Sequence, residues 1–97
     1  SSVVLSAEEG FERFGFAGEV YPNPVLNEAN LELTLTEALN ATVTVYSQTG
    51  QIVYTKKHSL KAGRQLLKLN LSGLSDGIYL LKINEGSNQL AKRFIKR

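Results

Sequence analysis

The sequence predicts an all-β fold, an antiparallel β-sandwich of about seven short strands. Apolar and polar side chains alternate through much of the chain, for example at Leu31, Leu33 and Leu35, and this period of two is typical of half-buried strands. Turn-forming residues separate the alternating stretches about every eight to twelve residues. The one run that could be helical, residues 60–71, contains Gly63 and alternates better than it follows a helical period. These observations favour strands throughout.

The first part of the chain is expected to lead into the fold. Residues 1–18 contain three glycines and an acidic stretch, and we expect a linker in which Phe14-Gly15-Phe16 could add a short edge strand. The segment Tyr21-Pro22-Asn23-Pro24 follows. It predicts a rigid corner, because each proline fixes its own φ and restricts the residue before it to extended geometry. Residues 19–97 are expected to form the single domain.

The middle of the chain predicts a strand followed by a hairpin. Residues 31–35 form the first clearly alternating strand, and residues 41–46 and 51–56 flank the turn Ser47-Gln48-Thr49-Gly50. Gly50 can adopt the positive φ that such a turn requires.

The last third predicts three more strands, at residues 67–71, 77–83 and 89–97, the last two joined by a polar turn. We expect Gly77 to act through its backbone conformation at the start of its strand, where it could also allow a close approach. Tyr79 is expected to bury its ring while its hydroxyl reaches a backbone partner. The residues expected in the core are Leu31, Leu33, Val43, Val45, Leu67, Leu69, Ile78 and Leu80. Together these elements fit an Ig-like antiparallel β-sandwich.

The length and composition limit the kinds of protein that this chain can be. A chain of 97 residues suits one domain. It contains no cysteine, which excludes a disulfide framework and a thiolate metal site. It begins with neither methionine nor a signal peptide, so we expect a mature fragment or an excised domain.

The net charge of +2 is unevenly distributed along the chain. Residues 1–40 hold seven of the nine acids, and residues 41–97 hold ten of the eleven bases. Two interpretations stay open: the two halves pair and their charges complement each other, or the basic half faces an acidic partner or anionic lipid headgroups. A nucleic-acid partner is disfavoured, because the bases do not interleave with exposed aromatic residues in one stripe.

The residues that most enzymes need are missing. His58 is the sole histidine, and it lacks an evident acid to orient its ring. There is no nucleophile elbow, phosphate-binding loop or zinc-ligand spacing, and the acids are too dispersed for a calcium site. We therefore expect no catalytic activity, no cofactor and no metal.

Several segments, taken in order, resemble a known family. Tyr21-Pro22-Asn23-Pro24 opens the domain, residues 43–51 form an apolar strand and a Thr-Gly hairpin turn, and residues 71–79 end in a Gly-Ile-Tyr signature. The chain closes on the basic and apolar residues 92–97. Over residues 19–97 this order resembles a C-terminal sorting domain of the type IX (Por) secretion system of Bacteroidetes-type bacteria. Gln51 departs from the arginine that is common at that place in the family.

The resemblance implies a non-catalytic export signal at the end of a larger cargo protein. Such a domain directs its cargo from the periplasm through an outer-membrane translocon and is handed to a β-barrel shuttle. It is usually removed by a sortase-like cysteine protease while the cargo is attached to the cell surface. The implied destination is the outer membrane, the cell surface or the medium. On this resemblance, residues 1–18 lie near the cleavage region.

The terminal strand is the predicted recognition element. Its strand edge could accept a strand from a partner, and its cations could pair with carboxylates on a receptor. The alternative is a solvated edge on which Lys and Arg prevent aggregation. The residues concerned are Lys92, Arg93, Phe94, Ile95, Lys96 and Arg97. The motif residues expected to be mainly structural are Tyr21, Pro22, Asn23, Pro24, Gly50, Gly77 and Tyr79.

Two other functions stay open. An adhesion or carbohydrate-binding module would need an aromatic platform, which Tyr21, Tyr46 and Tyr54 could form only if they share one face. A passive Ig-like spacer would work equally well inside a chain and would need no displayed terminus.

Overall fold

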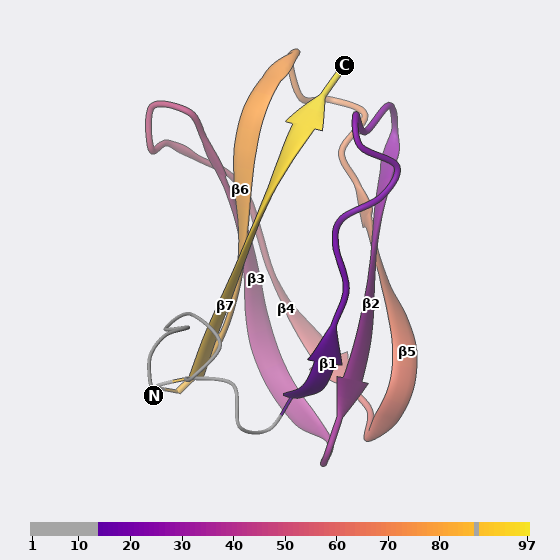
Figure 1. Ribbon diagram of the computed structural model, residues 1–97. Helices are drawn as coiled ribbons and strands as arrows, with labels where there is room; N and C mark the ends of the chain where they lie inside the picture. The colour runs from indigo at the N-terminus through magenta and orange to yellow at the C-terminus, as the bar shows by residue number, and fades with distance from the viewer. Residues whose placement is uncertain (1–13, 87) are drawn as a thin grey trace, which may run out of the picture.

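Two antiparallel sheets pack face to face in this protein (Figure 1). The computed structural model describes residues 14–86 and 88–97. Its strands are β1 (Phe14–Ala17), β2 (Glu28–Leu35), β3 (Leu39–Ser47), β4 (Ile52–Leu60), β5 (Gly63–Asn70), β6 (Gly77–Glu85) and β7 (Asn88–Lys96). The predictions of an all-β fold and of an antiparallel β-sandwich are therefore confirmed.

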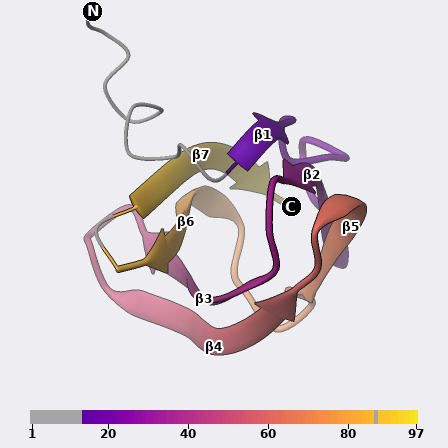
Figure 2. The same ribbon diagram turned by 90° about the horizontal axis from the view of Figure 1, so that it is seen from below.

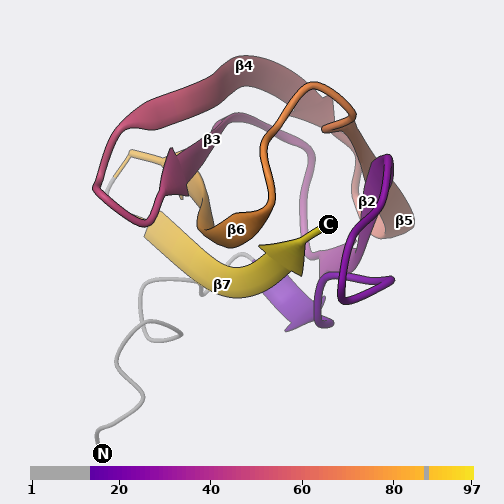
Figure 3. The same cartoon turned by 90° about the horizontal axis from the view of Figure 1, so that it is seen from above.

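The strands divide unequally between the sheets. One sheet has the order β1-β2-β5 and the other the order β4-β3-β6-β7. The chain passes from β4 to β5, and so from one sheet to the other, through residues 61 and 62 alone. Views from below and from above show β4 and β5 together on one side of the sandwich, with β1 and β7 on the opposite side (Figures 2 and 3). β1 lies within the segment expected to lead into the domain, and it pairs with β2 as an edge strand.

The alternating sequence pattern explains which side chains face inward. In β2, Ala29, Leu31, Leu33 and Leu35 are buried, and the residues between them are exposed or half-buried. Six of the eight predicted core residues are buried as expected: Leu31, Leu33, Val43, Val45, Leu67 and Leu69. A buried apolar side chain of this size contributes about 1.5–3 kcal/mol to stability.

The prediction of which β6 side chains face the core was wrong by one residue. Ile78 is 44% exposed and Leu80 is half-buried, whereas Tyr79, Leu81 and Ile83 fill the core. The physical reason is that β6 is apolar on both faces, so alternation alone does not say which face is inside. Pairing with β3 decides which face of β6 lies against the core.

The register between β6 and β3 shows which side chains of β6 face the core. Leu81 lies opposite Val45, and Ile83 lies opposite Val43. Both valines are fully buried, and residues opposite each other in a sheet point to the same face. A shift of one residue would place every buried side chain of β6 in solvent.

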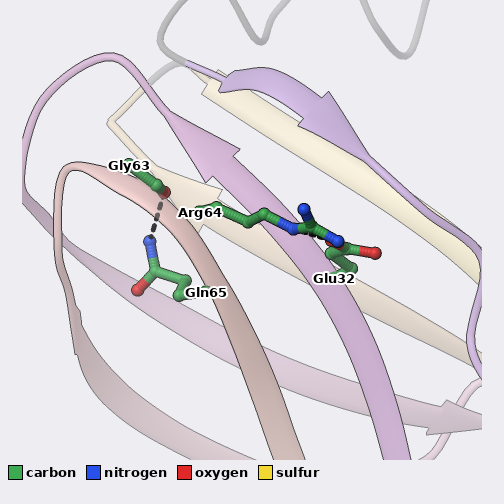
Figure 4. Close-up of polar contacts among 4 residues, drawn as sticks. All are labelled: Glu32, Gly63, Arg64 and Gln65. Atoms are coloured by element: carbon green, nitrogen blue, oxygen red, sulfur yellow. Dashed lines mark hydrogen bonds and ion pairs between the residues drawn. The ribbon is translucent and has the colours of Figure 1, made fainter.

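The turn between β4 and β5 is braced by side chains (Figure 4). Gly63 adopts a φ of 95°, which favours glycine. The amide of Gln65 donates to the carbonyls of Lys61 and Gly63, at 2.6 and 3.2 Å, and accepts from the Lys61 N–H at 3.0 Å. Beside the turn, Arg64 pairs with Glu32 across β5 and β2. The β4–β5 crossing between the sheets is thereby held in one geometry.

The orientation of β6 leads to a matched test. Ile83→Ala should lower the free energy of unfolding by about 2–5 kcal/mol, because it leaves a cavity in the core. Ile78→Ala removes the same atoms from the same strand and should cost less than about 1 kcal/mol, because Ile78 is exposed. Chemical denaturation of both variants checks this. Equal losses would mean that the two faces of β6 are assigned wrongly.

Candidate recognition site

The terminal strand β7 is an edge strand that pairs with β6 over its whole length. The predicted hairpin of paired strands at residues 77–97 is therefore confirmed. Side chains of β7 point alternately to the core and to the outer face of the four-stranded sheet. This alternation separates the predicted recognition residues into two sets.

The first set points toward the core. Phe94 is 1% exposed, and its ring stacks on that of Tyr79 with centroids 5.7 Å apart. Lys96 is 4% exposed, and its Nζ donates to the Arg97 carbonyl at 3.0 Å. Lys92 is mostly covered, and its Nζ pairs with Glu19 at 3.2 Å. In the folded domain these three side chains stabilise the strand and offer little surface to a receptor.

The second set is displayed. Arg93, Ile95 and Arg97 are exposed, and Arg93 and Ile95 lie on the outer face of the sheet opposite Leu80 and Ile78. A receptor that meets the folded domain can therefore contact these three residues directly. A recognition role for all six residues stays a prediction, and burial divides them into these two sets.

The outer edge of β7 is held by the proline corner. The Val25 N–H donates to the Ile95 carbonyl at 2.6 Å, and the Arg97 N–H donates to the Val25 carbonyl at 2.8 Å. Asn23 completes the contact, because its Oδ1 accepts from the Ile95 N–H at 2.9 Å. We call these contacts between residues 23–25 and 95–97 the terminal latch. Both proline peptide bonds of the corner, after Tyr21 and after Asn23, are cis.

The other half of this edge is open. The backbone groups of Ile95 point outward to the latch, so those of Arg93 and Ala91 point the same way by alternation. Within residues 14–86 and 88–97, neither has a backbone partner on that side. A strand from a partner could hydrogen-bond here, whereas the latch occupies the edge at residues 95–97.

The remaining motif residues are placed in turns and in the core. The Tyr79 hydroxyl donates to the Ser75 carbonyl at 2.7 Å, so its predicted backbone partner is confirmed. Gly50 has a φ of 90°, as its turn requires. The conformational role expected of Gly77 agrees with its φ of 157°. The close approach expected there was wrong, because a Cβ would lie at an ordinary contact distance, 3.8 Å, from the Tyr79 ring.

The tyrosines do not form an aromatic platform. Tyr21 bridges Asn30 beside the three-stranded sheet, whereas Tyr46 lies on the outer face of the four-stranded sheet. Tyr54 lies opposite the buried Val45, on the core-facing side of β4. The three rings therefore lie on different surfaces, and the condition set for a carbohydrate-binding platform is not met.

Two ion pairs within the described ranges join the acidic and the basic halves of the chain. Glu32 pairs with Arg64, and Glu19 pairs with Lys92. Pairing between the halves therefore accounts for part of the uneven charge. Lys82 and Arg93 form no ion pair with an acidic residue among residues 14–86 and 88–97.

His58 is half-buried, and its Nε2 lies 3.3 Å from the Tyr54 hydroxyl. Burial, and then the charge of Lys56, lower the pKa of His58, and burial raises the pKa of Tyr54. No group of three or more His, Asp or Glu among the described residues is placed to hold a metal ion. Nor does this part of the chain contain a helix that could cross a membrane.

A family model described as the secretion system C-terminal sorting domain matches residues 19–97. The chain belongs to this family. The sorting domain is thus a type IX secretion signal, which implies export to the outer membrane, the cell surface or the medium and interaction with the secretion machinery. Domains of this family are sorting signals and not catalysts.

Comparison with solved structures supports the fold alone. A β-glucosidase from Erythrobacter marinus matches with a TM-score of 0.51 and 10% sequence identity. The match covers 87% of the sorting domain and 15% of that enzyme's chain. The enzyme's activity therefore says nothing about this domain. No curated protein matches the sequence significantly.

Sequence reasoning missed the role of Asn23 in the sorting domain. The residue was expected mainly to shape a corner, but it binds the backbone of a residue 72 positions later. Such a contact leaves no periodic signal. The only hint was that a polar residue with a side-chain acceptor stands between two prolines, which lack N–H groups.

The latch predicts a small and local effect for Asn23→Ala. Loss of one hydrogen bond should lower the free energy of unfolding by about 1 kcal/mol and should speed hydrogen exchange at the Ile95 amide. Asn27→Ala is the control, because the Asn27 side chain makes no hydrogen bond within the described ranges. Exchange at Ile95 that is unchanged in the first variant would rule out the side-chain contact.

The lowered pKa of His58 predicts a pH dependence of stability. Because the unfolded chain binds this proton more tightly, at a pKa of about 6.5, the free energy of unfolding should fall as pH drops from about 7.5 through that value. His58→Gln should flatten this dependence, and Lys56→Gln should weaken it in part. Denaturation across this pH range measures the slopes. Equal slopes in all three proteins would contradict the assignment.

Proposed function

We propose that this sorting domain carries an upstream cargo from the periplasm through the outer-membrane translocon. It is then handed to a β-barrel shuttle, and a sortase-like cysteine protease removes it near residues 1–18 as the cargo is attached to the cell surface. The single observation that carries this proposal is the family match over residues 19–97. The details of the route are those that the family resemblance implies.

The folded terminal strand supports a specific role for residues 92–97 in this route. We propose that the receptor contacts the displayed side chains of Arg93, Ile95 and Arg97. The covered residues Lys92, Phe94 and Lys96 contribute indirectly, because they hold β7 against the core. In this proposal the open edge at Ala91 and Arg93 adds backbone hydrogen bonds, as in strand addition.

An export assay tests the function. The 97-residue chain is fused behind a reporter with a periplasmic signal peptide, in a bacterium that has a type IX system. The whole chain is used because β1 precedes residue 19 and pairs with β2. We expect the reporter at the cell surface or in the medium. A reporter that stays in the periplasm would overturn the proposal.

Substitutions in the same fusion test the displayed set. Arg93→Ala with Arg97→Ala should reduce export several-fold while the thermal unfolding of the domain changes little, because both side chains are exposed. Lys57→Ala with Lys68→Ala removes the same charge from exposed positions elsewhere and should export normally. Deletion of residues 92–97 is a poor test, because it removes the buried Phe94. Equal export by both double variants would show that the receptor does not recognise Arg93 and Arg97.

A further inference from the structure

The outer face of the four-stranded sheet carries a groove beside the β3–β4 hairpin. The groove encloses about 580 Å³. Its wall is formed by Ser47, Gln48 and Gly50 of the hairpin turn, and its floor and rim are formed by Tyr46, Ile78, Leu80, Lys82 and Arg93. The register explains why residues from three strands meet here, because Leu80 lies opposite both Tyr46 and Arg93.

The floor of the groove is apolar although it faces solvent. Ile78 is 44% exposed, and its cross-strand neighbour Ile95 is 41% exposed. Ile52, on β4 opposite Tyr46, is exposed as well. Apolar side chains that gather on one face, with polar residues around them, mark a binding surface more often than a scattered few do.

The rim of the groove is positively charged. The Lys82 Nζ lies 5.5 Å above the centroid of the Tyr46 ring, a cation–π contact that positions the ammonium over the floor. Arg93 projects from the neighbouring strand. Neither forms an ion pair within the described ranges, although Lys92 and Arg64 do. Two cations above an apolar floor are complementary to a ligand with carboxylates and a large apolar side chain.

The wall of the groove is pre-organised. The Ser47 N–H donates to the Gln51 carbonyl at 2.8 Å, and the Gly50 N–H donates to the Ser47 carbonyl at 2.9 Å. The Ser47 hydroxyl also lies 3.0 Å from that of Thr49. A rigid wall lowers the entropic cost of binding. The exposed Gln48 at the rim offers a donor and an acceptor, which a peptide backbone can use and an acyl chain cannot.

We infer that this groove binds an acidic peptide segment that inserts a large apolar side chain between Ile78 and Leu80. Its carboxylates pair with Arg93 and Lys82. This inference rests on the proposed function in one respect, because the segment would belong to a receptor of the sorting domain. It goes further because it names a binding surface, on the outer face of β3, β6 and β7, and the chemistry of the peptide that binds there.

A peptide titration tests the inference. The ¹⁵N-labelled 97-residue chain is titrated with the capped peptide Asp-Leu-Asp-Phe-Asp and with its neutral counterpart Asn-Leu-Asn-Phe-Asn. We expect chemical-shift changes at residues 46–50, 78–82 and 93 with the acidic peptide, and at least about tenfold weaker binding of the neutral one. Equal binding of both peptides, or shifts spread elsewhere, would overturn the inference.

Charge reversal gives the matched variants. Lys82→Glu with Arg93→Glu should weaken binding of the acidic peptide at least about tenfold, and it should create binding of the basic peptide Lys-Leu-Lys-Phe-Lys. Lys61→Glu with Lys68→Glu makes the same change in net charge away from the groove and should leave both affinities unchanged. The variant Lys82→Glu with Arg93→Glu gains a ligand, so its binding of the basic peptide also shows that it is folded. If the control pair weakens binding as much, the effect is only net charge.

Three further outcomes separate the possible ligands and the two proposals. If vesicles of anionic phospholipid bind the chain through Lys82 and Arg93 while the acidic peptide does not, the groove reads lipid and the inference falls. If the peptide fails to bind but the reporter fusion is exported, the inference falls and the sorting function stands. If the peptide binds and the reporter stays in the periplasm, the sorting function falls.

Discussion

The terminal latch is the constraint on which the arrangement of this domain depends. β7 is bound on one side by β6, and on the other side the backbone partner that it has among the described residues is Val25 of the latch. The same segment leads into β2 of the opposite sheet, so the latch also joins the two sheets. The prolines suit this position because Pro22 and Pro24 need donate no hydrogen bond, while Val25 donates and accepts. The family's first and last motifs are therefore two sides of one contact.

The basic residues at the end of the chain do two different things. Lys92 and Lys96 lie on the core-facing side of an edge strand, and the long stem of each side chain covers apolar surface while its ammonium finds an oxygen. Arg93 and Arg97 point outward, and neither forms an ion pair among residues 14–86 and 88–97. A run of four cations that looks uniform in the sequence is thus divided by the pleat of the strand. Of the outward pair, Arg93 also lines the groove on the neighbouring strands.

Much of this fold could be predicted from the sequence, and the remainder has a physical explanation. The strands, the turn at Gly50 and the buried hydroxyl of Tyr79 follow from local pattern and chemistry, which alternation and turn residues report directly. The inward face of β6 could not be predicted, because Ile78 and Ile83 are equally apolar and only pairing with β3 distinguishes them. The burial of Lys96 and the contact of Asn23 with Ile95 depend on residues far apart in the chain. Such contacts have no local signature.

The position of Phe94 has a consequence for the order of events during synthesis. Its ring completes the core beside Tyr79, and the residues just after it hydrogen-bond the backbone of Val25. A ribosome that stops before this point releases a chain whose sandwich cannot close, because the missing ring leaves a large cavity. The domain therefore folds only when translation has passed nearly its whole length. A folded domain therefore shows that translation has passed Phe94.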